Sequence, residues 1–197
     1  MSINKFNPRT IILIVFILVT GAVRTYLSLD ENMFGLSNFS PVGAMAIFGG
    51  AYFNKTWKAL FFPLLTLFVS DVVLQFTVFS KPGNGILYGG WYFVYAAFIL
   101  MVLVGRMIKK IRPGNILLAT FAVVTIHWLI SDLGVWYQCK TYSQDLAGYW
   151  NCLVMAIPFE GRFLMGTLIY SGILFGLFEW LKHKYPVLSI KNQAAHS

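Results

Sequence analysis

The chain has 197 residues, of which 58% are hydrophobic and only 11% are charged, and its mean hydropathy is +0.70. Soluble domains carry about 25% charged residues, so this composition excludes an ordinary soluble globule, a disordered chain and a small disulfide-rich secreted protein. The net charge of +8 fits the basic bias of membrane-protein loops, and we expect no nucleic-acid partner.

Apolar runs separated by polar segments predict an all-α, polytopic membrane protein with a single integral membrane domain and six transmembrane helices. The first run follows Lys5 and Arg9, as in a signal peptide, but no small-residue cleavage site follows it, so we expect a retained helix. The stretch 146–159 is short and has Pro158 near its end, which predicts a re-entrant or surface helix. The expected spans are residues 7–26, 41–53, 58–79, 88–107, 115–136 and 161–181.

The distribution of basic residues predicts that both termini are cytoplasmic. Only Arg24, Lys81, Lys140 and Arg162 fall on the opposite, outer side of the predicted spans. The outer connections are also longer than the inner ones, and long loops tend to carry function. The inner side holds Lys5, Arg9, Lys55, Lys58, Arg106, Lys109, Lys110, Arg112, Lys182, Lys184 and Lys191.

Ionisable and amide side chains gather in the outer halves of the spans, although each costs at least about 2.5–3.5 kcal/mol in lipid. Asp71 and Gln75 lie one turn apart on the third span, so they share a helix face. We expect ion pairs that join Arg24 or Arg162 to Asp71, Asp132 or Glu160. Such pairs can simply fix helix packing, but together these groups predict a polar cavity that opens outward. The candidate polar ligands of a substrate are Asp71, Gln75, His127, Asp132 and Arg162.

Aromatic residues crowd the same side of the membrane. Interfacial belts of Trp and Tyr explain many of them, but an aromatic-lined pocket shows the same excess. The candidates for packing the apolar part of a substrate are Trp91, Tyr92, Trp128 and Trp136.

Two cysteines and several small residues leave alternatives open. Cys139 and Cys152 fall in the last outer loop, where they form either a disulfide or two free thiols. Ala46 with Gly50, and Gly172 with Gly176, form small-xxx-small pairs that serve packing within the chain or docking on a partner. No nucleotide-binding, metalloprotease, nucleophile-elbow or CxxC motif occurs, so we expect neither an enzyme nor a bound cofactor or metal.

Two stretches carry a resemblance to a known family. Residues 38–53 read NFSPVGAMAIFGGAYF, and LAGYWNC at 146–152 is followed by AIPF at 156–159 and by Leu164, Gly166, Leu168 and Tyr170. These resemble the two signatures of an uncharacterised family of small bacterial membrane proteins described as putative transport proteins. The chain has Thr167 where the second signature carries an acidic residue.

That family is similar to the S components of energy-coupling factor (ECF) vitamin transporters. The resemblance implies a six-helix bundle in the bacterial inner membrane that binds a small vitamin-like compound from the extracytoplasmic side for uptake. It also implies, as partners, membrane lipid, a scaffold membrane subunit and ATPases, although the AxxxA scaffold motif of the first helix is absent here. The alternatives are a non-transporting subunit of a larger membrane assembly and a membrane-embedded enzyme that uses His127 with Asp71 or Asp132 as acid and base.

Overall fold

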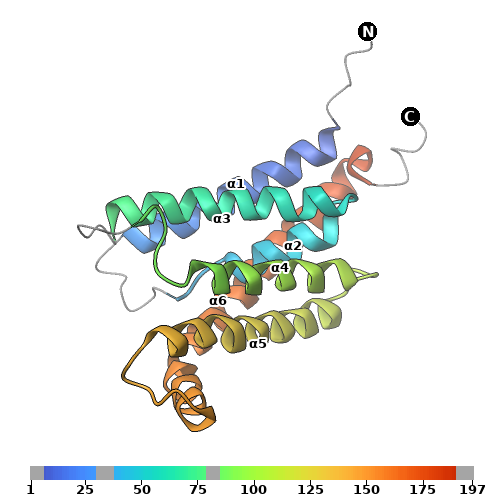
Figure 1. Cartoon of the computed structure of the whole chain (residues 1–197). Helices are drawn as coiled ribbons and strands as arrows, with labels where there is room; N and C mark the ends of the chain where they lie inside the picture. The colour runs from blue at the N-terminus through green and yellow to red at the C-terminus, as the bar shows by residue number, and fades with distance from the viewer. Residues whose placement is uncertain (1–6, 30–37, 79–84, 190–197) are drawn as a thin grey trace.

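The computed structural model of the chain describes residues 7–29, 38–78 and 85–189. Over these residues the protein is all-helical and contains no strand. Figure 1 shows α1 and α3 lying side by side, α4 and α5 forming a second pair, α2 between the two pairs and α6 running across the bundle. The helices are α1 (Pro8–Leu29), α2 (Val42–Tyr52), α3 (Thr56–Thr77), α4 (Trp91–Met107), α5 (Pro113–Gln138) and α6 (Leu146–Lys184), followed by the short 3₁₀ helix η2 (Pro186–Leu188).

Helix starts follow local sequence signals. α1 and α5 begin at Pro8 and Pro113, where the missing proline N–H costs no helical hydrogen bond. The side chain of Asp145 accepts a hydrogen bond of 2.7 Å from the Gly148 N–H and caps α6. Gly90 precedes α4 with a φ of 75°, a left-handed conformation that favours glycine.

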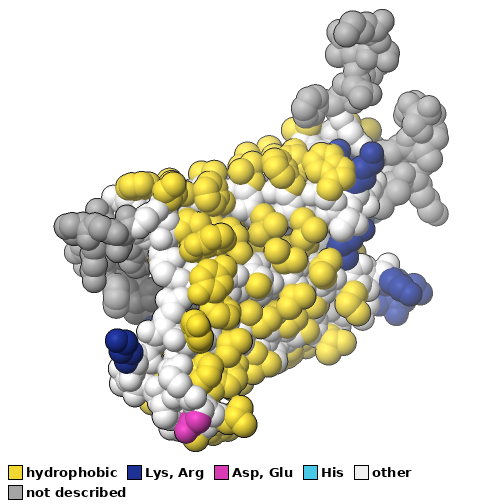
Figure 2. Space-filling view, viewed as in Figure 1, with side chains coloured by type: hydrophobic (Ala, Val, Ile, Leu, Met, Phe, Trp, Pro, Cys, Tyr) yellow, Lys and Arg dark blue, Asp and Glu magenta, His cyan; other side chains and the backbone are white. Residues whose placement is uncertain are grey.

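Among the described residues, four helices are long and apolar enough to cross a membrane: α1, α3, α5 and α6. Figure 2 shows a broad band of hydrophobic side chains across the visible face, with Lys and Arg gathered at one end of it. α4 has 17 residues and α2 has 11. At 1.5 Å per residue, α2 is only about half as long as the ~30 Å hydrocarbon layer. The predicted second span therefore corresponds to a short helix, and six full crossings are not established.

α2 is the centre of the bundle, because it contacts each of the five other α-helices. All but one of its residues are buried. Its glycine face brings two backbones together: a Cβ on Gly50 would lie 2.2 Å from the Val102 carbonyl oxygen, and a Cβ on Gly105 would lie 2.5 Å from that of Ile47. Small residues on α2 thus serve packing against α4 within the chain. The ring of Phe48 packs against the rings of Phe16, Phe175 and Phe178, and these form an aromatic core between α1, α2 and α6.

α6 differs from the expected pair of elements. We predicted a separate surface helix over 146–159 and a span over 161–181, whereas the structure has one helix of 39 residues with Pro158 inside it. Figure 1 shows its first portion, in orange, turned away from the direction of the rest. A proline bends a helix without ending it when the freed backbone groups find other partners, and the sequence pattern does not distinguish these outcomes.

Candidate functional site

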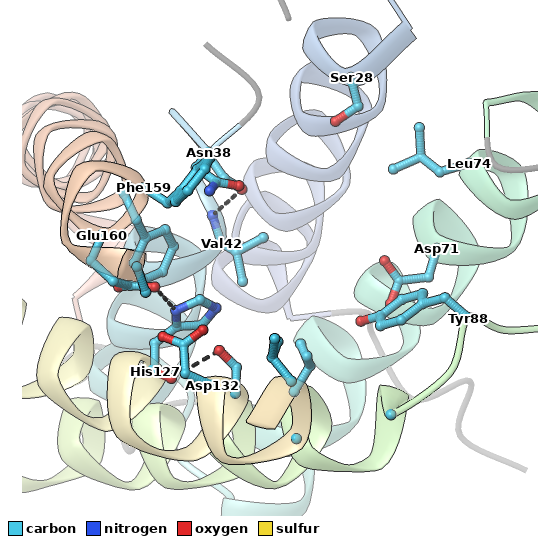
Figure 3. A pocket seen from close by; sticks show the side chains of 18 of the residues that line it. Ser28, Asn38, Val42, Asp71, Leu74, Tyr88, His127, Asp132, Phe159 and Glu160 are labelled. Carbon is cyan, nitrogen blue, oxygen red and sulfur yellow. Dashed lines mark hydrogen bonds and ion pairs between the residues drawn. The ribbon is translucent and has the colours of Figure 1, made fainter. Parts of the chain in front are cut away.

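A cavity of about 1570 Å³ opens among the ends of the helices. Its walls come from the last turns of α1, α3 and α5, the segments before α2 and α4, and the first part of α6. Small-molecule sites usually measure about 300–1,000 Å³, so this space is ample for a ligand of that kind. Figure 3 shows two polar groups facing it, one around Asp71 and one around His127.

The first polar group joins α1, α3 and α4. Arg24 Nη2 lies 2.6 Å from Asp71 Oδ1, and Arg24 also donates to the Ser70 hydroxyl. The Tyr95 hydroxyl donates to Asp71 Oδ2 at 3.0 Å. Figure 3 places the Tyr88 ring beside the same carboxylate. The Asp71 side chain is 1% exposed, so its charge depends on these partners. One predicted ion pair is therefore confirmed, and it leaves this wall electrically balanced.

The second polar group joins α5 and α6. His127 Nδ1 lies 2.8 Å from Glu160 Oε1, and the His127 ring packs against Phe163 at 4.3 Å between centroids. Asp132 faces the cavity one turn further along α5, as Figure 3 shows. Asp132 Oδ2 and Glu160 Oε2 are buried and accept no hydrogen bond from the described residues. This wall thus carries two carboxylates against one imidazole.

The start of α2 lies at the same cavity. Val42 lines the cavity, together with Asn38 and Ser40 of the preceding segment. A Cβ on Gly43 would come within 3.2 Å of the Phe163 ring, which places the first turn of α2 close to the His127 and Glu160 wall. The N-terminal end of a helix carries partial positive charge. The start of α2 therefore adds positive potential near this wall.

The predicted polar ligands fall into two sets. Asp71, His127 and Asp132 line the cavity. Gln75 is 2% exposed and lies outside the described lining, and its amide nitrogen and oxygen have no partner among the described residues. Arg162 also lies outside the lining, with its guanidinium 5.4 Å from the centre of the Phe159 ring, and the described carboxylates do not pair with it.

The four predicted aromatic residues lie outside the described lining of the cavity. The indole N–H of Trp128 donates to the Leu153 carbonyl at 3.0 Å, and that of Trp136 donates to the Ser143 carbonyl at 2.8 Å. Both indoles thus connect α5 to the α6 region. Trp91 and Tyr92 are 41% and 48% exposed on the surface of α4. The apolar cavity wall is instead formed by residues such as Leu67, Leu74, Val94 and Phe163.

Both cysteines line the cavity as free thiols. Cys152 is buried, and its Sγ lies 3.7 Å from the Asp132 carbonyl oxygen. Cys139 is half-buried at the end of α5. Of the alternatives that the sequence left open, the structure shows the pair of thiols. Among the described residues, no group of three or more His, Cys, Asp or Glu side chains is arranged to hold a metal ion.

The hydroxyl groups of Tyr88 and Tyr95 contribute to the Asp71 wall but were not predicted as ligands. Both tyrosines belong to an aromatic-rich segment, and the composition of that segment also fits an interfacial belt. Glu160 was expected to pair with an arginine, whereas its partner is the imidazole of His127. The sequence feature that could have separated Glu160 from the arginines is its position shortly after Pro158, in the bent part of α6.

These features define the class: over the described residues, a helical protein with four helices long and apolar enough to cross a membrane, and a cavity whose largely apolar wall carries two polar groups. The chain belongs to the family of unknown function DUF6580, whose model matches residues 4–188. No characterised protein and no solved structure matches the chain.

Proposed function

We propose that this protein binds a small molecule from the extracytoplasmic side of the bacterial cytoplasmic membrane, for uptake, in the manner of an ECF S component. One observation carries the proposal: the cavity of about 1570 Å³ holds Asp71, Asp132 and Glu160 at the depth of apolar helices. Carboxylates are costly there. A bundle that needed only packing would fill the space with apolar side chains.

The charge distribution supports the orientation. The beginnings of α1 and α3 lie at the end of the bundle opposite the cavity, near the end of α6 and η2. Lys and Arg gather at that end in Figure 2, and among the described residues it includes Arg9, Lys55, Arg106 and Lys182. Basic residues favour the cytoplasmic side. The cavity would then face outward.

The ligand chemistry follows from the wall of α5 and α6. Asp132 Oδ2 and Glu160 Oε2 are buried acceptors without a partner in the described part of the chain, whereas the opposite carboxylate of Asp71 is already paired with Arg24. A ligand with an ammonium group or several N–H donors satisfies both acceptors. The remaining wall is largely apolar, so the rest of the ligand is an apolar or aromatic body, as in several vitamin-like compounds.

Uptake requires energy, and the chain has no nucleotide-binding motif. We propose that a scaffold membrane subunit with ATPases supplies it. Gly172 and Gly176 support a docking face on α6, because a Cβ at either position would meet no atom within 4 Å. The same face suits the alternative function, a non-transporting subunit of a larger assembly, and a sealed, ligand-free cavity in the purified complex would favour that alternative.

A membrane-embedded enzyme that uses His127 with Asp71 or Asp132 as acid and base is the other alternative. Among the described residues, His127 instead pairs with Glu160, at 2.8 Å, so an enzyme at this site would use that pair. Recovery of a chemically altered ligand after incubation would favour the enzyme, whereas a carrier returns the ligand unchanged.

The test is ligand binding to the purified protein in lipid nanodiscs. A panel of vitamin-like and amine-bearing compounds is screened by thermal stabilisation, and co-purified ligand is sought by native mass spectrometry. Asp132→Asn and Glu160→Gln should each weaken binding roughly 10–100-fold, the value of a hydrogen bond to a charged group of about 1.5–3 kcal/mol. Asp145→Asn is the matched control, because Asp145 is an exposed acid outside the described cavity lining. No stabilisation by any compound or by cell extract would refute the proposal.

A further inference from the structure

A second, smaller pocket lies at the opposite end of the bundle from the cavity. It has a volume of about 130 Å³ and sits between the start of α1, the end of α2 and the start of α3. Three of its described lining residues are the cations Arg9, Lys55 and Lys58, and none is an acid. One water molecule occupies ~30 Å³ in the liquid. The pocket therefore suits a compact polar group and excludes a drug-sized ligand.

Arg9 is the buried cation of this pocket. It is 3% exposed, and its guanidinium donates to the Leu188 carbonyl at 2.7 Å and to the Tyr52 carbonyl at 2.8 Å. Its Nε is also buried and has no partner among the described residues. Both acceptors are neutral carbonyls, and the guanidinium otherwise lies near the rings of Tyr52 and Phe178, so no carboxylate of the described residues pairs directly with it. A buried charge in this condition is costly.

Glu179, on the neighbouring part of α6, already has two partners. The Tyr52 hydroxyl donates to Glu179 Oε1, and Lys182 Nζ lies 2.8 Å from the same carboxylate. Glu179 is also outside the described lining of the pocket. Glu179 also attracts Arg9 through space, but this one carboxylate faces Lys182 and the three cations of the pocket, so positive charge remains in excess.

Two helix starts add to the positive potential. α1 begins at Pro8 and α3 at Thr56, and both positions adjoin the pocket lining. The residue before α3, Lys55, provides no side-chain cap for the first N–H groups of that helix. At α1 the Asn7 side chain accepts a hydrogen bond from the Arg9 N–H, so that helix contributes mainly through its dipole, which attracts anions at the N-terminal end.

The position relative to the membrane suggests the source of the anion. Trp57, in the first turn of α3, is 56% exposed, and Lys58 Nζ lies 5.5 Å from the centre of its ring. Exposed tryptophans and lysines at helix ends mark the level of the lipid headgroups. Basic pockets between helices at this level bind anionic headgroups.

We propose that the pocket formed by Arg9, Lys55 and Lys58 binds a phosphate group, supplied by an anionic membrane phospholipid. The phosphate oxygens complete the hydrogen bonding of the pocket and neutralise its charge. The lipid thereby holds the starts of α1 and α3 against the end of α2. This inference is independent of the function proposed for the cavity.

The experiment uses the full chain, delipidated in detergent. Phosphatidylglycerol, diacylglycerol with the same acyl chains and inorganic phosphate are added separately, and binding is followed by native mass spectrometry and thermal stability. Phosphatidylglycerol should bind and stabilise, whereas diacylglycerol, which lacks phosphate, should not. Equal stabilisation by inorganic phosphate alone would keep the phosphate site and make free phosphate its source.

Paired variants localise the effect. Lys55→Gln with Lys58→Gln should weaken phosphatidylglycerol binding roughly 30-fold, at about fivefold per basic residue near the surface. Lys109→Gln with Lys110→Gln is the matched control, because these lysines are exposed and lie outside the described lining of the pocket. The control should change binding less than about twofold, since it leaves the pocket intact. Equal losses in the two pairs, or equal binding of phosphatidylglycerol and diacylglycerol, would overturn the proposal.

Discussion

Removing Arg24 from its ion pair with Asp71 should destabilise the protein more than removing the charge of Asp71. The two side chains of the pair differ in exposure, at 16% for Arg24 and 1% for Asp71. Arg24→Met removes the cation and leaves a carboxylate that is 1% exposed, with the Tyr95 hydroxyl as a donor and the Tyr88 ring beside it. Leaving a buried charge unpaired costs about 3–5 kcal/mol. Asp71→Asn keeps an acceptor for Tyr95 and leaves Arg24 at the edge of the cavity, so we expect a cost of only about 1–3 kcal/mol.

The double variant tests the reasoning. With Asp71→Asn in place, Arg24→Met no longer leaves a charge buried, so the two effects should fall short of additivity by about 2 kcal/mol or more. The free energy of unfolding is measured by titration of the protein with denaturing detergent in mixed micelles. Arg162→Met is the control, because Arg162 packs on Phe159 and forms no ion pair with the described carboxylates. The reasoning fails if Arg24→Met destabilises no more than Arg162→Met, or if Asp71→Asn is the costlier change.

Three further predictions follow from local geometry. Gly50→Ala should destabilise the protein by about 1–3 kcal/mol, because its Cβ would meet the α4 backbone at 2.2 Å. Gly172→Ala has open space at its Cβ and should stabilise the protein by ~0.5–1 kcal/mol. Similar melting temperatures for the two variants would contradict this prediction. Hydrogen bonds from the Gly148 N–H and the Ser143 hydroxyl lower the pKa of Asp145, so its helix cap is fully effective above the ordinary carboxyl pKa of about 4 and is lost as pH falls through the lowered pKa. The melting-temperature gap between the wild type and Asp145→Ala should therefore shrink on acidification, and a gap that does not change with pH would count against the cap. A maleimide should label the half-buried Cys139 before the buried Cys152, and failure to label either until reductant is added would reveal a disulfide instead.

The helical class and the approximate helix positions were predictable from hydropathy, because burial in lipid requires long apolar runs. The expected 58–79 and 115–136 lie within two residues of α3 and α5 at each end. The short central helix was harder to interpret, since a run such as 41–53 suits both a short span and a helix enclosed by its neighbours. The glycine face of α2 explains why it is enclosed by its neighbours, because it lets the backbone of α4 come into direct contact with the backbone of α2.

The ionisable side chains of the cavity were predictable in part, because such groups are rare and costly in apolar helices. Asp71, His127 and Asp132 all face the cavity. The roles of the aromatic residues were not predictable, since a tryptophan suits a membrane interface, a pocket or a link between helices equally well. Trp128 and Trp136 donate hydrogen bonds toward the α6 region, and that choice depends on where α6 bends, which the sequence pattern leaves undetermined.

The end of α2 has a consequence for how the chain assembles during synthesis. The Tyr52 carbonyl accepts a hydrogen bond from Arg9, which precedes α2 in the chain, and the Phe53 carbonyl accepts one from Arg106, which follows it. Unsatisfied carbonyls are expensive in hydrocarbon. The carbonyls at the end of α2 therefore have both partners only after α4 has been synthesised, so this central helix reaches its final hydrogen bonding late in the assembly of the bundle.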